Sequence, residues 1–484
     1  MKVPLQKLVH FSQNAFIPGR TIPENILLAQ ELLTGYNQSH LPKRCAMKID
    51  LRKAYDTVAW DFVLAAMLQF GFHTTFINWV KECITTPTYS ISVNGGPQGF
   101  FHATRGLRQG DPLSPYLFVL VMECLHATIQ FHIHQDGGFA YHWKCEKLNL
   151  YMLSFVDDIL LFCRAEEHSI LLLTFAMQQF SELSGLHANH SKTQCFLSRS
   201  AAELTEEVLN LTGFQLGQLP GIIKEIEQRC KRFLWKGNGD RGAAKVAWKH
   251  ICKPVVAGGL GIRALWPMNR ALMCKHLWNV VTDNPDSIWV QWIKEYRLQN
   301  HSIWTAPATT GSWTWKKLLK LSDAMLPGLE FHIGDGSKLW LWLDPWHSSG
   351  VLLHNYPRGP IVAGFDRTNK LQAAIVEGAW AWPTRTPQAI TTSLPLIHGG
   401  PDAIIWRGTS SGRFSTQTAY QMLTQEDQPV PWHTLMSDFH ELALLIADDK
   451  SSYFGHILTG LLVFYGHRGA GEENTLSMLL IDSF

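Results

Sequence analysis

The chain has 484 residues, of which 46% are hydrophobic and 17% are charged. This composition excludes a disordered protein, and the length allows two or three domains with a substantial core. The formal net charge is only +2, so overall charge gives no argument for a nucleic-acid partner and any basic surface has to be local.

Nine cysteines are scattered singly, with no C-x-x-C pair, which argues against a disulfide framework and against a zinc cluster. Their odd number favours a reducing compartment. The amino terminus lacks the apolar core of a signal peptide, and no apolar run reaches the roughly 18 residues needed to span a bilayer. We therefore expect a soluble, intracellular protein with no membrane partner.

The first clear element is a helix close to the amino terminus. Thr21 stands at an N-cap position and Glu24 follows three residues later, which predicts a helix over 22–33. Arg20 lies in the turn before this helix. Its side chain either contacts a phosphate or is simply solvated.

A short apolar strand over 45–51 carries Asp50 near its end, and a helix over 59–70 follows. An acid at the end of a strand, just before a helix, is well placed to project into a cleft. Tyr55 either belongs to the core or faces that cleft. Asp56 is expected to position the local turn rather than to bind metal.

A helix over 75–83 precedes an alternating strand over 89–93, and the dipeptide Asn94-Gly95 predicts a tight hairpin turn after it. The segment 105–115 contains two glycines, which allow a backbone to approach a ligand closely. A helix is expected from there to about Phe131. A glycine-lined loop that feeds a helix can hold a base pair or a phosphate, although the signal is weak by itself.

Two adjacent acids, Asp157 and Asp158, interrupt an apolar run over 154–162. The apolar residues predict two short buried strands with the acids at the tip between them. Two carboxylates at one tip repel each other, and a divalent cation relieves that repulsion. This favours a Mg²⁺-binding hairpin, and the alternative is an ordinary surface turn.

An amphipathic helix over 167–183 follows, and a loop over 186–192 leads to a strand over 193–197. Lys192, at the end of that loop, is either a proton donor close to phosphates or a solvated side chain.

The order of these blocks resembles the palm of a reverse transcriptase, and most closely the non-LTR (LINE-type) retrotransposon enzymes of plants. Residues 48–56, 106–115, 155–158 and 184–193 are similar to motifs A, B, C and D of that family. Residues 14–16 and 18–20 resemble the end of its fingers.

The resemblance implies an RNA-directed DNA polymerase with two Mg²⁺ ions, an RNA template, a DNA primer and dNTPs. Asp50 and Asp157 would hold the ions, with Asp158 in support. Tyr55 stands where the family has the aromatic residue that disfavours a ribose 2′-OH, and Lys192 where it has a lysine that protonates pyrophosphate. The other implied contacts are Arg108, Gln109 and Gly110 to nucleotide or template, and, more weakly, Arg20, Lys231 and Arg232 to the nucleic-acid backbone.

The downstream half also resembles this family, over 226–235, 246–262, 333–346 and 406–420. The 19 tryptophans of the chain crowd toward this half, and we interpret them as core packing of a helical region. Basic residues over 224–253 are interleaved with aromatic residues. They either grip template or primer or form a solvated helix face.

Three departures from the family bear on activity. The chain starts late, without the upstream strands of the fingers. At 217–224 two segments are joined that the family separates by its primer grip and most of its thumb. After about Trp432 the likeness ends without a Cys/His cluster, so no zinc is expected. Feeble or absent polymerisation is the expectation for this chain alone, because small misplacements of a substrate are costly.

The expected fold is α+β, with a reverse-transcriptase palm (an antiparallel sheet backed by helices), partial fingers and a mostly helical, Trp-rich carboxy-terminal region. The expected function is that of a truncated reverse transcriptase from a plant-type retroelement, nuclear if functional. The alternatives are a non-catalytic nucleic-acid-binding remnant and an inert product of a decayed element. The expected domains are fingers remnant 1–45, palm 46–200, truncated thumb or connection 201–236, Trp-rich region 237–435 and divergent tail 436–484. The oligomeric state is not predicted.

Overall fold

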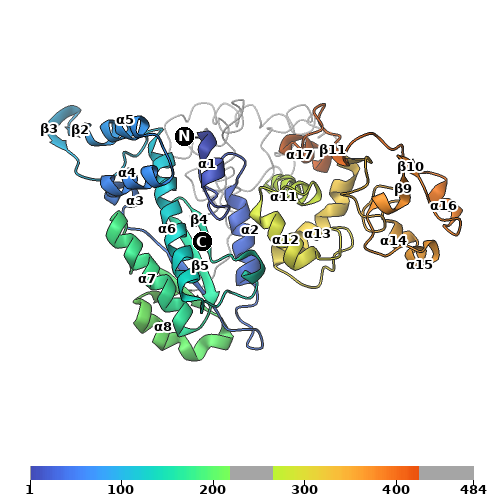
Figure 1. Ribbon diagram of the computed structural model, residues 1–484, viewed down its shortest axis with the longest axis horizontal. Helices are drawn as coiled ribbons and strands as arrows, with labels where there is room; N and C mark the ends of the chain where they lie inside the picture. Colours follow the sequence, from blue (N-terminus) through green and yellow to red (C-terminus); the bar gives the residue numbers. More distant parts are fainter. Residues whose placement is uncertain (1, 218–264, 425–484) are drawn as a thin grey trace, which may run out of the picture. The chain divides into compact units, whose positions relative to one another are not determined.

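The computed structural model describes residues 2–217 and 265–424. The chain forms two compact units. Figure 1 shows the chain coloured by residue number. The first consists of Met1–Gln218, Asp283–Gln299 and Thr309–Trp315, and the second of Leu219–Thr282, Asn300–Ala308 and Lys316–Phe484. The described residues do not include Lys231, Arg232, the blocks 226–235 and 246–262, or the tail 436–484.

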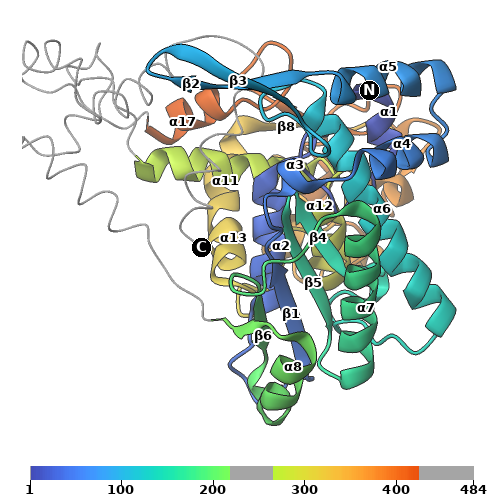
Figure 2. The ribbon, with the colours of Figure 1, turned by 90° about the vertical axis from the view of Figure 1, so that its left-hand side faces the viewer.

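The first unit is built on a five-stranded sheet with the strand order β4-β5-β1-β6-β7, which Figure 2 shows beside the helices. Its central strand pairs antiparallel with β5 on one side and β6 on the other, as predicted. The edge strand β7 runs parallel to β6, so the sheet is mixed at that edge. The strands are β1 (Arg44–Ile49), β4 (Met152–Phe155), β5 (Asp158–Arg164), β6 (Gln194–Leu197) and β7 (Gln215–Leu216).

Apolar helices pack on this sheet and on one another. The central one is α6 (Ser114–Asp136), which begins at the end of segment 105–115, as predicted, and ends later than Phe131, before the left-handed Gly137. By length and composition α6 could cross a membrane, but 61% of its apolar stretch is buried within the structure. The other helices of this part are α1 (Lys2–Leu8), α2 (Ile22–Leu33), α3 (Ala54–Thr57), α4 (Trp60–Gln69), α5 (Thr74–Thr85), α7 (Glu167–Ser184) and α8 (Thr205–Thr212).

The predicted helices over 22–33, 59–70, 75–83 and 167–183 are confirmed within two residues at each end. The predicted turn at Asn94-Gly95 joins β2 (Thr88–Val93) to β3 (Gly96–His102). Thr21 is the N-cap of α2 by its extended backbone, but its side chain makes no capping hydrogen bond. The helix therefore begins there without the capping box that its sequence suggested.

Two downstream segments belong to the first unit, which the sequence did not predict. They contain α12 (Ile288–Ile293) and a π-helical turn over Lys294–Leu298. Trp292 donates its indole N–H to the carbonyl of Lys144 at 2.7 Å. Arg297 forms an ion pair with Glu31 of α2, and the backbone N–H of Ser312 donates to the same carboxylate at 3.1 Å. The side chains of Glu31 and Arg297 are only 2% and 14% exposed, so this pair is buried.

Removing the charge of Glu31 should destabilise the first unit strongly. Glu31→Gln leaves Arg297 buried without a counter-ion, which costs about 3–5 kcal/mol. The measurement is urea-induced unfolding of the full chain, followed by tryptophan fluorescence.

The matched control is Lys294→Gln, which breaks the solvent-exposed pair between Lys294 and Asp283. An exposed pair contributes about 0–1 kcal/mol, so this variant should unfold close to the parent. Equal losses in the two variants would contradict a special role for the buried pair.

The second unit has a core rich in tryptophan. The side chains of Trp342 and Trp406 are almost fully buried, which supports core packing as their role. The further helices downstream of residue 264 are α11 (Leu265–Val281), α13 (Trp313–Met325), α14 (Leu352–Asn355), α15 (Gly359–Ala363), α16 (Gln388–Thr391) and α17 (Thr416–Thr424). Two antiparallel strand pairs accompany them. Strand β8 (Leu329–His332) pairs with β11 (Ala403–Trp406), and β9 (Ile375–Val376) pairs with β10 (Ala379–Trp380). Much of this region is irregular loop rather than helix.

A buried carboxylate organises the loop of the second unit that resembles the family at 333–346. Asp402 accepts backbone N–H groups from Gly334 and Gly336 on one oxygen, at 2.8 and 3.0 Å. Its other oxygen accepts from Lys338 and Leu339, at 2.9 and 3.2 Å. A Cβ atom on Gly334 would come within 2.1 Å of the Gly400 carbonyl, so the glycine is required by packing. This block of the sequence is therefore explained by structure.

Candidate active site

The two adjacent acids lie at the tip of a tight hairpin, as the sequence predicted. Strands β4 and β5 pair up to Phe155 opposite Asp158, which leaves only Val156 and Asp157 in the turn. Val156 has φ = 56°, a left-handed conformation that a β-branched residue rarely adopts. Such strain is retained where the surrounding structure enforces it, and it is commonly found at functional sites.

The register of the sheet brings Asp50 to the same tip. Strands β1 and β5 pair antiparallel up to Ile49 opposite Ile159. Continued by one residue, this register sets Asp50 opposite Asp158. Acids 107 positions apart in the sequence therefore meet at one end of the sheet.

The charges of these acids influence the pKa values of nearby groups. The pKa of the Asp157 carboxyl is raised above its ordinary value, first by partial desolvation and second by the negative charge of Asp50. The pKa of the Tyr55 phenol is raised to about 12, mainly by burial and further by the charge of Asp157. The charge of Asp50 therefore acts on Asp157, and the charge of Asp157 acts on Tyr55.

The loop after α7 closes around the end of β1. The backbone N–H of Asn189 donates to the carbonyl of Asp50 at 2.7 Å, and the N–H of Asp50 donates to the hydroxyl of Thr193 at 3.2 Å. Lys192 is exposed within this loop, and its N–H donates to the Asn189 carbonyl at 3.0 Å. The backbone of the Lys192 loop is thereby fixed to the strand end that carries Asp50.

The glycine-lined loop docks against the segment that follows Asp50. Gly106 donates its N–H to the carbonyl of Val58 at 2.8 Å, and Leu107 donates to the carbonyl of Tyr55 at 2.6 Å. The indole N–H of Trp60 donates to the carbonyl of Gly106 at 2.6 Å. Gly106 has φ = 94°, and a Cβ there would come within 2.7 Å of the Asp56 carbonyl oxygen. Only glycine fits at this position.

Two predicted contact residues are oriented by neighbours from other motifs. The ring of Tyr55 stacks on Phe118 of α6, with centroids 4.7 Å apart. The amide of Gln109 donates to the Asp56 carboxylate at 3.2 Å. Asp56 was expected to position the local turn, and its side chain also joins that turn to the glycine loop.

Substituting Gly106 should cost more stability than substituting Gly110 in the same loop. Both glycines have left-handed backbones, but a Cβ at Gly110 meets nothing within 4 Å. Gly110→Ala carries only the left-handed strain, about 1–2 kcal/mol, whereas Gly106→Ala adds a clash with backbone. We expect the difference in urea unfolding of the full chain, and equal losses would contradict the docking of the loop through Gly106.

The remaining predicted site residues are spread more widely. Arg20 donates to the carbonyls of Val9, His10 and Gln13 at 2.6–2.9 Å, so its guanidinium already serves the fold. Arg108 and Gly110 are exposed on the glycine loop. Lys231 and Arg232 fall outside the described residues. Contacts of these residues to nucleic acid stay predictions.

Sequence reasoning missed the roles of Thr193 and Trp60. The hydroxyl of Thr193 accepts the Asp50 N–H from a neighbouring strand, and the indole of Trp60 holds the glycine loop. Neither contact has a local signal, because each depends on how distant segments pair in the fold. Thr193 immediately follows Lys192, and this position was the only available hint.

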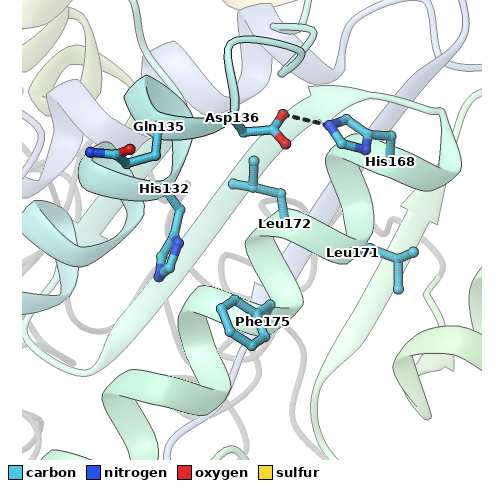
Figure 3. Close-up of a pocket in the computed structure, with 7 residues that line it drawn as sticks. All are labelled: His132, Gln135, Asp136, His168, Leu171, Leu172 and Phe175. Atoms are coloured by element: carbon cyan, nitrogen blue, oxygen red, sulfur yellow. Dashed lines mark hydrogen bonds and ion pairs between the residues drawn. The ribbon is translucent and has the colours of Figure 1, made fainter.

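A surface pocket of about 400 Å³ lies away from the acids, between the end of α6 and the first half of α7 (Figure 3). Asp136 and His168 face each other at its rim, with the Asp136 carboxylate 2.5 Å from the His168 ring nitrogen. The start of α7 follows the far end of β5, about 20 Å along the strand from the acidic tip. The pocket therefore has no part in the chemistry of the acids. Its lining residues are His132, Gln135, Asp136, His168, Leu171, Leu172 and Phe175.

The donor set at the tip suits a hard divalent cation. Among residues 2–217 and 265–424, no three His, Cys, Asp or Glu side chains gather into a preformed metal cluster. Mg²⁺ does not require one, because it binds through one or two carboxylates and takes its other ligands from water and substrate phosphates. Asp50 and Asp157, which the sheet register brings to one tip, are carboxylates of this kind.

Comparison with known proteins gives this site a family. The family described as reverse transcriptase (RNA-dependent DNA polymerase) matches residues 1–234. A Pol polyprotein of the type-1 retrotransposable element R2 from Popillia japonica is 31% identical over 46% of this chain and 30% of its own length. An Arabidopsis thaliana protein named as a ribonuclease H protein is 28% identical over 43% of this chain and 36% of its own length. The Pol polyprotein of element R2DM from Drosophila melanogaster is 27% identical over 44% and 20%.

Solved structures of telomerase show a more distant likeness. The apo enzyme from Candida tropicalis, truncated of its carboxy-terminal domain, has 15% identity and a TM-score of 0.29, over 37% of this chain and 35% of that chain. This chain spans between about a fifth and about a third of the length of the curated relatives named above. Residues 1–234, which contain the acids gathered at one hairpin, match the reverse transcriptase family, and the chain is similar to the Pol polyproteins of R2 retrotransposable elements.

Proposed function

We propose that this chain is an RNA-directed DNA polymerase that adds nucleotides to the 3′-hydroxyl of a primer. The observation that carries the proposal is the register of β1 with β5, which brings Asp50 to the turn that holds Asp157 and Asp158. In this reading Asp50 and Asp157 hold two Mg²⁺ ions and Asp158 supports them. When bound, such ions lower the pKa of an attacking hydroxyl and stabilise the charge of a leaving pyrophosphate.

The residues around the acids have positioning roles in this proposal. Phosphoryl transfer depends mainly on alignment and charge, because the protein itself supplies little covalent chemistry. Gln109, held by Asp56, and Gly110 would support the new base pair, and Arg108 would contact a phosphate. Lys192 would deliver a proton to the pyrophosphate. Its loop is fixed to the Asp50 carbonyl, which supports that role.

Tyr55 is proposed to select the sugar of the incoming nucleotide. Its ring is immobilised against Phe118, and its phenol is sensitive to the charge of Asp157. A rigid aromatic ring beside the reacting phosphate can exclude a 2′-hydroxyl by contact. RNA template, DNA primer and dNTPs are the proposed partners, and the nucleus is the proposed location of an active protein.

Neutralising Asp157 should abolish primer extension. Asp157→Asn removes a metal ligand with little change of shape, and the loss of several kcal/mol of transition-state stabilisation corresponds to a rate lower by about 10³-fold or more. The measurement is extension of a DNA primer on an RNA template by the full chain with Mg²⁺.

The matched control is Asp136→Asn, which alters a carboxylate in the surface pocket beside His168. It should extend the primer like the parent. Activity that survives in Asp157→Asn would mean a wrong site. Salt-dependent RNA binding with no extension in the parent would favour the binding remnant over the enzyme.

Tyr55→Ala should relax the choice of sugar. Removing the ring opens space for a 2′-hydroxyl, so the ratio of kcat/KM for ribonucleotides over deoxyribonucleotides should rise by about tenfold or more. Tyr55→Phe keeps the ring stacked on Phe118 and should keep the parent ratio. An unchanged ratio in Tyr55→Ala would refute the role.

A further inference from the structure

The β2–β3 hairpin carries an apolar face that the described fold leaves uncovered. Among the described residues the two strands pair only with each other, and Figure 1 draws them beyond the end of α5, apart from the five-stranded sheet. Asn94 and Gly95 in the turn both have positive φ, as a tight two-residue turn requires. A two-stranded hairpin is marginal in water by itself. An uncovered apolar face on such a hairpin therefore indicates a binding surface.

The apolar residues gather on one side of the hairpin. Because side chains alternate along a strand, Tyr89, Ile91 and Val93 share a face. Phe101 is the cross-strand partner of Tyr89, and their rings stack with centroids 5.9 Å apart. Ile91, Val93 and Phe101 are 62%, 51% and 50% exposed. We call these four residues the aromatic face. Phe100 lies on the other side of the hairpin, opposite Ser90.

The charge around the hairpin has one sign. Between Glu82 and Asp111 the sequence contains no acidic residue. The same stretch contains His102, Arg105 and Arg108, all exposed. Stacked rings followed within a few residues by exposed arginines match the two parts of a single-stranded nucleic acid, whose bases stack on aromatic rings and whose phosphates attract arginine. The absence of acidic residues between Glu82 and Asp111 favours a negatively charged ligand over an uncharged protein surface.

The hairpin is joined directly to the candidate site. Strand β3 ends at His102, and four residues later Gly106 is bound to the Val58 carbonyl, beside the segment that carries Tyr55. From this juxtaposition we infer that the aromatic face binds the unpaired RNA template by base stacking, before the template enters the site. The inference rests on the proposed function for the identity of the strand as RNA.

The test is binding of a fluorescein-labelled oligouridine of twelve nucleotides to the full chain, followed by anisotropy in EDTA without dNTPs. Phe101→Leu keeps the apolar volume but removes the π-face, and it should weaken binding by about 5- to 100-fold. Phe101→Trp should retain or tighten binding. Tyr89→Leu, which removes the other ring of the pair, should give a loss similar to that of Phe101→Leu.

The matched control lies on the same hairpin. Phe100→Ala removes a ring that is 77% exposed on the opposite side, and it should bind the RNA within about twofold of the parent. Arg105→Ala should lower the slope of log affinity against log salt by about 0.7. Parent-like binding in both Phe101→Leu and Tyr89→Leu, or an equal loss in Phe100→Ala, would overturn the inference. So would a monomer–dimer equilibrium of the parent that Phe101→Leu abolishes, because a second copy would then cover the face.

The two proposals fail separately. If the parent chain does not extend a primer but its RNA binding still depends on Phe101, the polymerase proposal is wrong and the binding surface is retained. If primer extension proceeds while RNA binding is indifferent to Phe101 and Tyr89, the binding surface falls and the polymerase proposal stands.

Discussion

The register that gathers three acids at one end of the palm sheet is the constraint from which the candidate site follows. The register of β1 with β5 places Asp50 against the β4–β5 turn, and the charge of Asp50 raises the pKa of Asp157. Carboxylates that lie close together repel one another. The arrangement becomes reasonable when a cation shares the space, which is why the geometry favours metal-dependent chemistry.

Two loops of the palm fix the backbone around these acids. The glycine loop and the loop after α7 both bind to the backbone around Asp50, through Leu107 and Asn189. The left-handed Val156 holds the turn in a shape that its side chain opposes. Backbone hydrogen bonds therefore set the positions, and side chains such as Tyr55 and Gln109 are oriented secondarily by Phe118 and Asp56. Three motifs that are distant in sequence are held together in this way.

Local patterns predicted most elements of the palm, because periodicity, glycine stops and the Asn94-Gly95 turn are encoded over a few residues. The acidic hairpin was visible in the sequence for the same reason, as two acids in an apolar run. The contacts of Thr193, Trp60 and Asp56 were not visible, since each joins segments that meet only in the fold. The parallel edge strand β7 and the capping of α2 without a side-chain bond were decided by packing rather than by local preference.

The buried pair of Glu31 and Arg297 joins distant parts of the first unit, which is not one continuous stretch of sequence. A retroelement copy whose reading frame closed before residue 283 would keep all three acids and both loops around them. It would nevertheless leave the buried carboxylate of Glu31 without Arg297 and without the Ser312 N–H. A frameshift well downstream of the motifs can therefore prevent the first unit from folding. Such a copy would still contain all the motifs, so the presence of the motifs alone does not show that the unit folds.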